Sequence, residues 1–266
     1  MLAKRIIPCL DVKNGQVVKG INFEGLREVG DPVEMGAFYS EQGADELVYL
    51  DISASSEGRR TFTDLVSRIA ERIDIPFTVG GGISSFEDAA RLLDAGADKI
   101  TINTAAVLQP EIISKIASRY GSQFVVVAID ARTVASMAAE PVEATSLYGN
   151  AYWQVMTYGG KRPTDKELYL WAKEVRNLGA GEILFTSMDH DGTRNGYAVE
   201  AYSRIADELS IPVIASGGAG SVADIEEVLT KGRADAALAA SIFHYGEISI
   251  PELKRTLRTH GVNVRI

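Results

Sequence analysis

An internal repeat restricts the possible folds of this chain more than any other feature. Residues 43–82 align without a gap with residues 179–218, at an offset of 136 positions. The sequence Ser-Arg-Ile-Ala at 67–70 recurs unchanged at 203–206, and the pair Gly81-Gly82 recurs as Gly217-Gly218. Agreement over 40 residues is not expected by chance, so the chain contains two similar units.

Each copy alternates short apolar segments with segments of helical spacing. In the first copy, residues 47–50, 77–79 and 99–102 are predicted strands, and residues 62–72 and 86–95 are predicted helices. The second copy predicts the same order of elements. This alternation indicates a parallel sheet whose strands are connected by helices.

The strand that precedes each copy is repeated as well. Residues 5–10, followed by Asp11, resemble residues 124–129, followed by Asp130, at an offset of 119. Each half then supplies four strands, which end near residues 11, 51, 80 and 103 and near 130, 187, 216 and 240. Eight strand–helix units in 266 residues predict an α/β protein with a (β/α)8 TIM barrel, a single domain over 1–266 with half-barrels at approximately 1–120 and 121–266. An open doubly wound sheet is the alternative, but it does not account for a duplication of four strands.

The two offsets differ by 17, so the second half carries extra residues somewhere in 131–165. Residues 137–145 are predicted to form a polar loop, and residues 152–160 one arm of a β-hairpin. Long loops in compact domains are functional or disordered, and the sequence leaves the role of the 131–150 stretch open.

Composition excludes several classes of protein. The longest wholly apolar run has six residues, at 124–129, far short of the ~18–20 that a membrane span needs. A net charge of −9 argues against a nucleic-acid binder. The single cysteine, Cys9, fits a reducing cytoplasm. The three histidines are too far apart in the sequence to indicate a metal cluster.

Glycine-rich turns follow two equivalent strands, at 80–82 and 217–220. Glycine lets the backbone approach an anion closely, and the N-terminus of the following helix adds partial positive charge. Asn103 and Thr104 end the strand beside the first turn, and Ser241 ends the strand beside the second. Because the two halves lie opposite each other in a barrel, two such sites predict a ligand with a phosphate at each end.

Asp11 and Asp130 occupy equivalent strand ends, so we expect them to face each other across the barrel mouth. Each alone is explained by capping of the following turn, which aspartate does well. As a pair they favour general acid–base catalysis on one substrate. Asp189-His190-Asp191-Gly192 follows the sixth strand; Gly192 could extend the second phosphate site, and His190 is interpreted as an exposed loop residue. Residues 51–55 are a weaker candidate wall of the same mouth.

Four charged residues stand at strand starts, at the other end of the predicted barrel: Arg5, Glu46, Lys99 and Glu182. Each alone is explained as a solvated side chain. Together the two cations and two anions could close the barrel bottom as a neutral ring, which composition cannot show.

The chain resembles the cyclase subunits of imidazole glycerol phosphate synthase, from histidine biosynthesis, over nearly its whole length. Eight ordered motifs carry the resemblance, at residues 4–12, 17–20, 80–83, 102–106, 127–130, 179–184, 191–193 and 215–220. The resemblance implies a lyase-type reaction without a metal or redox cofactor. A partner glutaminase releases ammonia, which crosses the barrel from its N-terminal face. The ammonia converts a bisphosphorylated ribotide, PRFAR, into imidazole glycerol phosphate and AICAR.

The resemblance also implies roles for individual residues. Asp11 and Asp130 become the acid–base pair, and Lys19 lies on a mobile loop over the substrate. The sequence does not decide which aspartate is the base; we favour Asp11 as base and Asp130 as acid. The other implied groups are Gly82, Asn103 and Thr104 at one phosphate; Asp191, Gly192, Gly217, Gly218 and Ser241 at the other; Arg5, Glu46, Lys99 and Glu182 at the ammonia gate; and Asp98 and Gln123 facing the glutaminase. Ala198 stands where relatives often have aspartate, so it is assigned no role.

Three other functions compete with the cyclase. A sister isomerase of the same pathway shares two phosphate sites and two aspartates, but it has no ammonia to admit. A cyclase-like protein of surface-sugar pathways often lacks the first aspartate, which this chain has as Asp11. A catalytically silent barrel that only supports a partner would not need both aspartates and both glycine turns.

Overall fold

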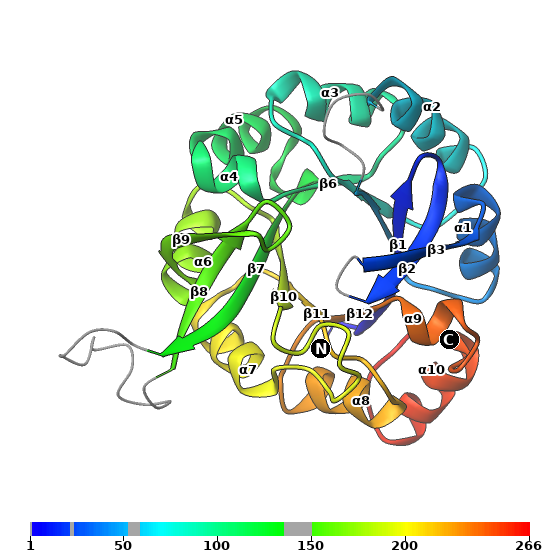
Figure 1. Cartoon of the computed structure of the whole chain (residues 1–266). Helices are drawn as coiled ribbons and strands as arrows, with labels where there is room; N and C mark the ends of the chain where they lie inside the picture. Colours follow the sequence, from blue (N-terminus) through cyan, green and yellow to red (C-terminus); the bar gives the residue numbers. More distant parts are fainter. Residues whose placement is uncertain (1, 22–23, 53–58, 136–150) are drawn as a thin grey trace.

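A closed barrel of parallel strands forms the centre of the protein. The computed structural model describes residues 2–21, 24–52, 59–135 and 151–266. β12 pairs with β1 and thereby closes the barrel, which confirms the predicted (β/α)8 architecture (Figure 1). In their order around the barrel, the strands are β1 (Arg5–Lys13), β4 (Leu47–Asp51), β5 (Phe77–Gly80), β6 (Lys99–Ile102), β7 (Val125–Ala135), β10 (Glu182–Ser187), β11 (Val213–Ser216) and β12 (Ala236–Ala239).

Helices surround this barrel on the outside (Figure 1). Most are amphipathic, so that one side packs on the strands and the other faces water. The described helices are α1 (Pro32–Glu41), α2 (Arg59–Ala70), α3 (Phe86–Asp94), α4 (Thr104–Leu108), α5 (Glu111–Tyr120), α6 (Leu168–Asn177), α7 (Val199–Glu208), α8 (Val222–Thr230), α9 (Ser241–His244) and α10 (Ile250–Thr259), with a 3-10 turn at Ser122–Phe124.

The strand and helix predictions agree closely with these bounds. The predicted strand 99–102 is β6 without change, and the predicted helix 86–95 is α3 less its last residue. The predicted helix 62–72 is shifted, because α2 begins at Arg59 and ends at Ala70.

Alternate residues of the strands fill the barrel interior. Ile7 and Cys9 of β1 belong to one buried cluster with Val48, Val126 and Leu184 of three other strands. The residues between them pack outward in a second, larger cluster beneath the helices. This period of two fixes which side chains of each strand can reach the two mouths of the barrel.

Both halves insert an antiparallel hairpin between their first strand and first helix. β2 (Gln16–Ile21) pairs with β1 and β3 (Glu24–Gly30), and β8 (Ala151–Thr157) pairs with β7 and β9 (Arg162–Glu167). The predicted hairpin arm at 152–160 is therefore confirmed as β8 and the turn after it. The segment around Lys19, expected as a loop, forms strand β2 instead, because its backbone pairs with Arg27 in β3. The 17 extra residues lengthen the second hairpin, and the polar loop predicted at 137–145 lies outside the described residues.

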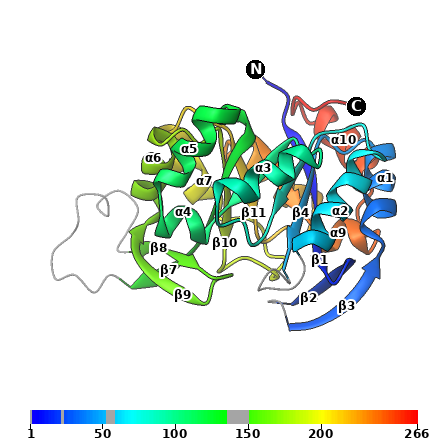
Figure 2. The same ribbon diagram turned by 90° about the horizontal axis from the view of Figure 1, so that it is seen from above.

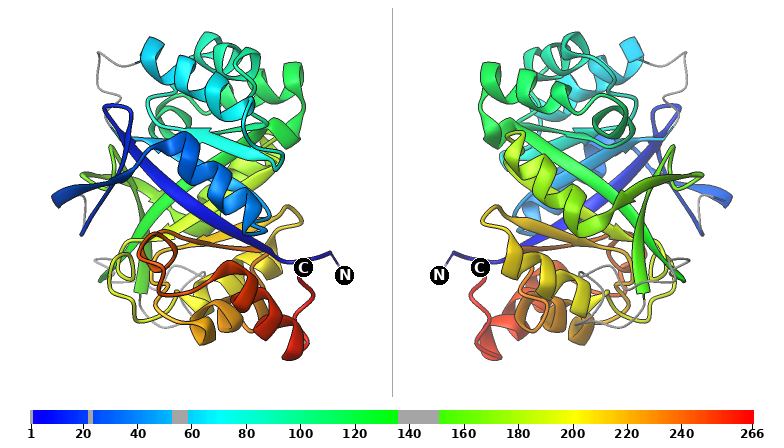
Figure 3. Two further views of the ribbon diagram at one scale, coloured as in Figure 1. Left: turned by 90° about the vertical axis from the view of Figure 1, so that its right-hand side faces the viewer. Right: turned by 90° about the vertical axis from the view of Figure 1, so that its left-hand side faces the viewer.

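The two faces of the barrel differ in what they hold. Both chain ends lie on the face where the strands begin, and both hairpins lie on the opposite face (Figures 2 and 3). Lys4, just before β1, forms a parallel bridge with Val264 near the other end of the chain. Beside them the buried ammonium of Lys254 pairs with Asp45 at 2.8 Å. None of the helices in the described parts is long and apolar enough to cross a membrane.

Candidate active site at the carboxyl ends of the strands

Asp11 lies at the upper end of the barrel interior. It follows Ile7 and Cys9 at the same period of two, and both of those side chains are in the interior cluster. Its backbone pairs with Leu50 of β4, and the residue is only 8% exposed. The position is therefore that of an inward-facing carboxylate at the mouth, and not that of a surface turn residue.

Asp130 occupies the equivalent place on β7 and has a distinct environment. The side-chain amide of Asn103 donates a hydrogen bond to Asp130 Oδ2 at 2.9 Å, and Thr186 of β10 also bonds to the carboxylate. Burial and the negative charge of Asp191 nevertheless raise the pKa of Asp130 from 3.8 to about 6. A carboxyl with this pKa can hold or release a proton near neutral pH, as acid–base catalysis requires.

The two glycine turns can exist only with glycine. Gly81 has φ of 101°, and a Cβ there would lie 2.1 Å from the carbonyl oxygen of Asp51. Gly218 has φ of 108°, and a Cβ there would lie 2.0 Å from the carbonyl oxygen of Gly196. The first turn therefore exposes a bare backbone at Gly81 and Gly82, whereas Gly217 and Gly218 of the second turn are buried.

An aspartate in the helix that follows each turn accepts hydrogen bonds from the backbone of that turn. Asp88 Oδ2 accepts hydrogen bonds from the N–H groups of Ser84 and Ser85, both at 3.0 Å. At the equivalent place Asp224 Oδ2 accepts from Gly220 N–H, also at 3.0 Å. The sequence prediction missed both aspartates, although their shared offset of 136 was a usable indication.

The strand ends beside the turns also match in backbone form. Asn103 has φ −125° and ψ −86°, and Ala240 has φ −124° and ψ −75°. Thr104 and Ser241 follow them as the first residues of α4 and α9. The Thr104 hydroxyl accepts a hydrogen bond from Tyr158 N–H at 2.9 Å, and the Asn103 amide is directed at Asp130.

The segment after β10 borders the second turn. Asp191 N–H donates to the carbonyl of Ser187 at 2.9 Å, which places its carboxylate close enough to Asp130 to affect that pKa. Gly192 has φ of 75° and is exposed. His190 is partly buried and lies 2.7 Å from the Ser187 hydroxyl, so its interpretation as a simple exposed residue is wrong.

The four charged residues at the strand starts meet inside the barrel bottom. Arg5 bonds to Glu46 at 2.8 Å and also to Glu182, and Lys99 lies 2.9 Å from both carboxylates. Burial acts to lower the pKa of Arg5, but the hydrogen bonds and charges of Glu182 and Glu46 outweigh it and raise that pKa. The four side chains form a closed, neutral ring, so the reading of each as a separately solvated charge is wrong.

Thr78 joins this ring and was missed by the sequence prediction. Its hydroxyl donates to Glu46 Oε1 at 2.8 Å. Thr186 was missed as well, although the spacing of 182, 184 and 186 on one strand directs it into the barrel.

Asp98 and Gln123 are exposed on the face where the strands begin. Asp98 accepts a hydrogen bond from Phe77 N–H at 3.0 Å, and Gln123 donates to the carbonyl of Tyr120 at 3.1 Å. Both are therefore accessible on the face opposite the two aspartates.

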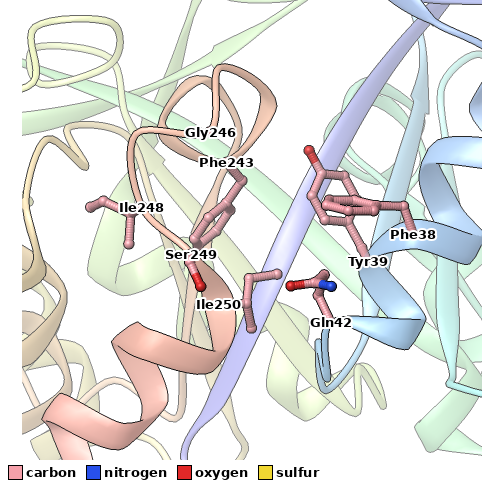
Figure 4. Close-up of a pocket in the computed structure, with 8 residues that line it drawn as sticks. All are labelled: Phe38, Tyr39, Gln42, Phe243, Gly246, Ile248, Ser249 and Ile250. Carbon is pink, nitrogen blue, oxygen red and sulfur yellow. The ribbon is translucent and has the colours of Figure 1, made fainter.

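A hollow on the outer wall contains none of the predicted site residues. It has a volume of about 120 Å³ and lies between α1 and the segment joining α9 to α10 (Figure 4). The side chains of Tyr39, Phe243 and Ile250 are among those that line this hollow, and most of its surface is apolar. Within the described residues, no group of three or more His, Cys, Asp or Glu side chains is arranged to hold a metal ion.

Comparison with known proteins decides the family. Residues 5–249 match the family described as "Histidine biosynthesis protein". The chain is 60% identical over its whole length to "Imidazole glycerol phosphate synthase subunit HisF" of Phocaeicola vulgatus. The chain belongs to the HisF family of histidine biosynthesis proteins. Proteins of the same printed name in Bacteroides fragilis and Geobacillus thermodenitrificans are 58% and 55% identical, again with full coverage of both chains.

Membership in the HisF family makes the chain an enzyme subunit of histidine biosynthesis and agrees with the resemblance deduced from its motifs. It disfavours the sister isomerase and the surface-sugar protein as its identity. The HisF barrel here brings Asp130, Asn103, Thr186 and Asp191 together at one mouth.

Proposed function

We propose that the chain uses ammonia to convert PRFAR into imidazole glycerol phosphate and AICAR, with Asp11 and Asp130 as the acid–base pair. The observation that carries this proposal is the placement of two carboxylates at equivalent strand ends, both at the mouth of the barrel. Asp130, whose pKa is raised to about 6, is suited to donate the proton. We assign the role of base to Asp11, its counterpart on the first strand.

The substrate would lie across the mouth, with one phosphate at each glycine turn. Gly82, Asn103 and Thr104 serve the first phosphate, and Gly217, Gly218 and Ser241 the second, with Gly192 and Asp191 beside it. The main-chain N–H groups of both turns suit a phosphate, which accepts hydrogen bonds only. We also assign Lys19, whose backbone lies in strand β2, to the substrate.

Ammonia would enter from the opposite end. The ring of Arg5, Glu46, Lys99 and Glu182 lies on the barrel axis below the interior cluster. We assign the ring the role of a gate; because it is neutral, it has no excess charge that would trap ammonium at the entrance. The apolar interior above it separates ammonia from bulk water before it meets the substrate.

A glutaminase subunit is the proposed source of that ammonia. The relatives are named as subunits of a synthase, which supports an assembly of two chains. The face that holds the ring also presents Asp98 and Gln123, and we place the glutaminase there. A biosynthetic pathway and a single buried cysteine are consistent with a cytoplasmic enzyme. The chain acts as one domain of two half-barrels, each contributing one aspartate and one phosphate site.

The test is an assay of the purified chain with PRFAR and an ammonium salt, followed by chromatographic measurement of AICAR. We expect ammonium-dependent product from the wild type. Asp11→Asn keeps the shape of the side chain but removes its basicity, and we expect kcat to fall by about 10²–10⁴-fold.

A matched control uses Asp94→Asn, at the exposed end of α3, which should leave kcat unchanged. Absence of AICAR with the wild type would exclude the proposed reaction. Full activity of Asp11→Asn would exclude only its role. Addition of the glutaminase subunit and glutamine in place of ammonium then tests the proposed partner.

A further inference from the structure

The turn between β8 and β9, at residues 158–161, contacts a strand end with which it does not pair. Tyr158 N–H donates a hydrogen bond to Thr104 Oγ1 at 2.9 Å, and Figure 1 shows this turn beside α4. A Cβ on Gly160 would come within 2.4 Å of Met188 Cε, so the turn also lies against the segment after β10. Because β6 and β10 flank β7, the turn bridges both neighbours of the strand that carries Asp130.

The conformation of this turn is unfavourable for its first residue. Tyr158, Gly159 and Gly160 have φ angles of 54°, 62° and 79°. Glycine adopts such angles readily, but tyrosine does not. The guanidinium of Arg162 lies over the Tyr158 ring at 4.4 Å, and Thr157 Oγ1 donates to the Arg162 carbonyl at 3.2 Å. A strained residue that neighbouring contacts hold in place beside a binding site indicates a functional constraint.

The bond from Tyr158 determines what the Thr104 hydroxyl can do. A hydroxyl that accepts from an N–H group directs its own hydrogen elsewhere. In the parts of the chain that the structure describes, no acceptor for that hydrogen lies within hydrogen-bonding distance. A phosphate oxygen is an acceptor of this kind. The neighbouring Asn103 amide uses one of its two N–H bonds on Asp130, so the Thr104 hydroxyl is the hydroxyl donor of this strand end.

We propose that Tyr158 is a positioning residue of the first phosphate site, whose main-chain N–H orients the Thr104 hydroxyl to donate to the phosphate of the substrate. The proposal rests on the proposed function in taking Thr104 as a phosphate ligand. It also assigns a role to the hairpin of the second half: its turn completes the phosphate site of the first half.

The experiment removes the donor without touching Thr104. In Tyr158→Pro the N–H is absent, and proline cannot adopt a φ of 54°. We expect KM for PRFAR to rise about five- to tenfold while kcat stays within about twofold, because the lost bond acts on the bound substrate throughout the reaction. Tyr158→Asn is the matched control: it keeps the N–H and tolerates the left-handed region, so KM should stay within about twofold of the wild type.

A double variant separates orientation from general damage to the hairpin. Thr104→Val removes the hydroxyl, so adding Tyr158→Pro should raise KM no further. Independent effects that multiply in the double variant would overturn the proposal, and so would a wild-type KM in Tyr158→Pro. Thermal unfolding by circular dichroism accompanies each variant, but the comparison of KM values decides even if one melts earlier.

Failure of the proposed function would look different. If the wild type forms no ammonium-dependent product, calorimetric titration with inorganic phosphate replaces the assay. The orientation proposal then requires Tyr158→Pro and Thr104→Val to weaken phosphate binding equally, and an affinity unchanged in Tyr158→Pro would overturn it.

Discussion

The side-chain amide of Asn103 points at the carboxylate of Asp130, with Nδ2 2.9 Å from Oδ2. The sequence assigned Asn103 to a phosphate, because it ends the strand beside a glycine turn. The structure joins one of its two amide N–H groups to the residue proposed as the acid, which leaves the other for the proposed phosphate. This contact stabilises the ionised form of Asp130, and so opposes the burial that raises its pKa.

The pH dependence of kcat/KM should report the proton on Asp130. If Asp130 donates the proton, the active form is protonated, and kcat/KM falls about tenfold per pH unit above about 6. The measurement runs from pH 5 to 8.5, with the concentration of free ammonia held constant because that concentration also changes with pH. A rate that rises through pH 6 would show that Asp130 is the base.

Replacement of Asn103 should shift the pH at which kcat/KM begins to fall, the basic limb of the pH profile. Asn103→Leu removes a hydrogen bond that lowers the pKa of Asp130, so the decline of kcat/KM should begin at higher pH. A residue that only binds phosphate would change KM and leave the position of the limb unaltered. Asn103→Gln, which retains an amide donor, serves as the comparison.

Asp130→Asn should stabilise the fold while it abolishes catalysis. The folded-state pKa of about 6 lies above the ordinary 3.8, so the favourable contribution of Asp130 is complete below about pH 4 and is lost as pH rises through about 6. The side-chain amide introduced by Asp130→Asn stays neutral at every pH, so it does not lose this stability. Its oxygen can still accept the hydrogen bond from Asn103. Urea unfolding should therefore show a gain of about 1–3 kcal/mol at pH 8 that disappears at pH 4. An equal gain at both values of pH would contradict the burial of a charged carboxylate.

Removal of one charge from the bottom ring should be costly. Glu46→Gln leaves Arg5 and Lys99 facing Glu182 alone, which buries an unbalanced positive charge. We expect the free energy of unfolding in urea to fall by about 3–5 kcal/mol. Glu174→Gln, which breaks an exposed pair with Lys166, should change it by less than about 1 kcal/mol. Equal effects of the two variants would show that the ring is solvated.

A methyl group at the second glycine turn should damage both stability and binding. In Gly218→Ala the Cβ meets the Gly196 carbonyl, whose backbone is itself bonded to Gly218, so neither can move freely. We expect a loss of at least about 2 kcal/mol and a raised KM for PRFAR. Gly246→Ala, with φ of 66° but open space around it, should cost only about 1 kcal/mol and leave KM unchanged.

The repeat was sufficient to predict the barrel and the positions of both aspartates. Strand ends that recur at fixed offsets fix which residues reach the mouth, because every strand of a closed parallel barrel opens on the same face. Asp11 and Asp130 were located in this way, and so was the set of charges at the opposite end. These predictions needed only the path of the backbone, and the spacing of apolar residues in the sequence is enough to predict that path.

Contacts between side chains from distant segments could not be predicted from the sequence. The hydrogen bond from Asn103 to Asp130 could not be predicted, because Asp130 lies in a different strand, 27 residues later in the chain. Strand β2 was missed because its segment contains Lys19 and Gly20 where alternation would be expected. Tyr158 gave no indication at all, since its bond to Thr104 uses a main-chain N–H group that every residue except proline possesses.

The bottom ring shows where the two copies of the repeat have diverged. Glu46 and Glu182 are counterparts, but the cations Arg5 and Lys99 come from the first copy alone, and their counterparts Phe124 and Ala236 are uncharged. At the upper mouth, by contrast, aspartates, glycine turns and fastening carboxylates are all duplicated. A symmetric ancestor of two identical halves would have kept the upper mouth much as it is now, but its bottom charges would not have balanced: two first halves give surplus positive charge, and two second halves give surplus negative charge. The residues of the upper mouth can therefore date from before the duplication. The neutral ring, in contrast, could form only after the duplication, when the two halves could change independently.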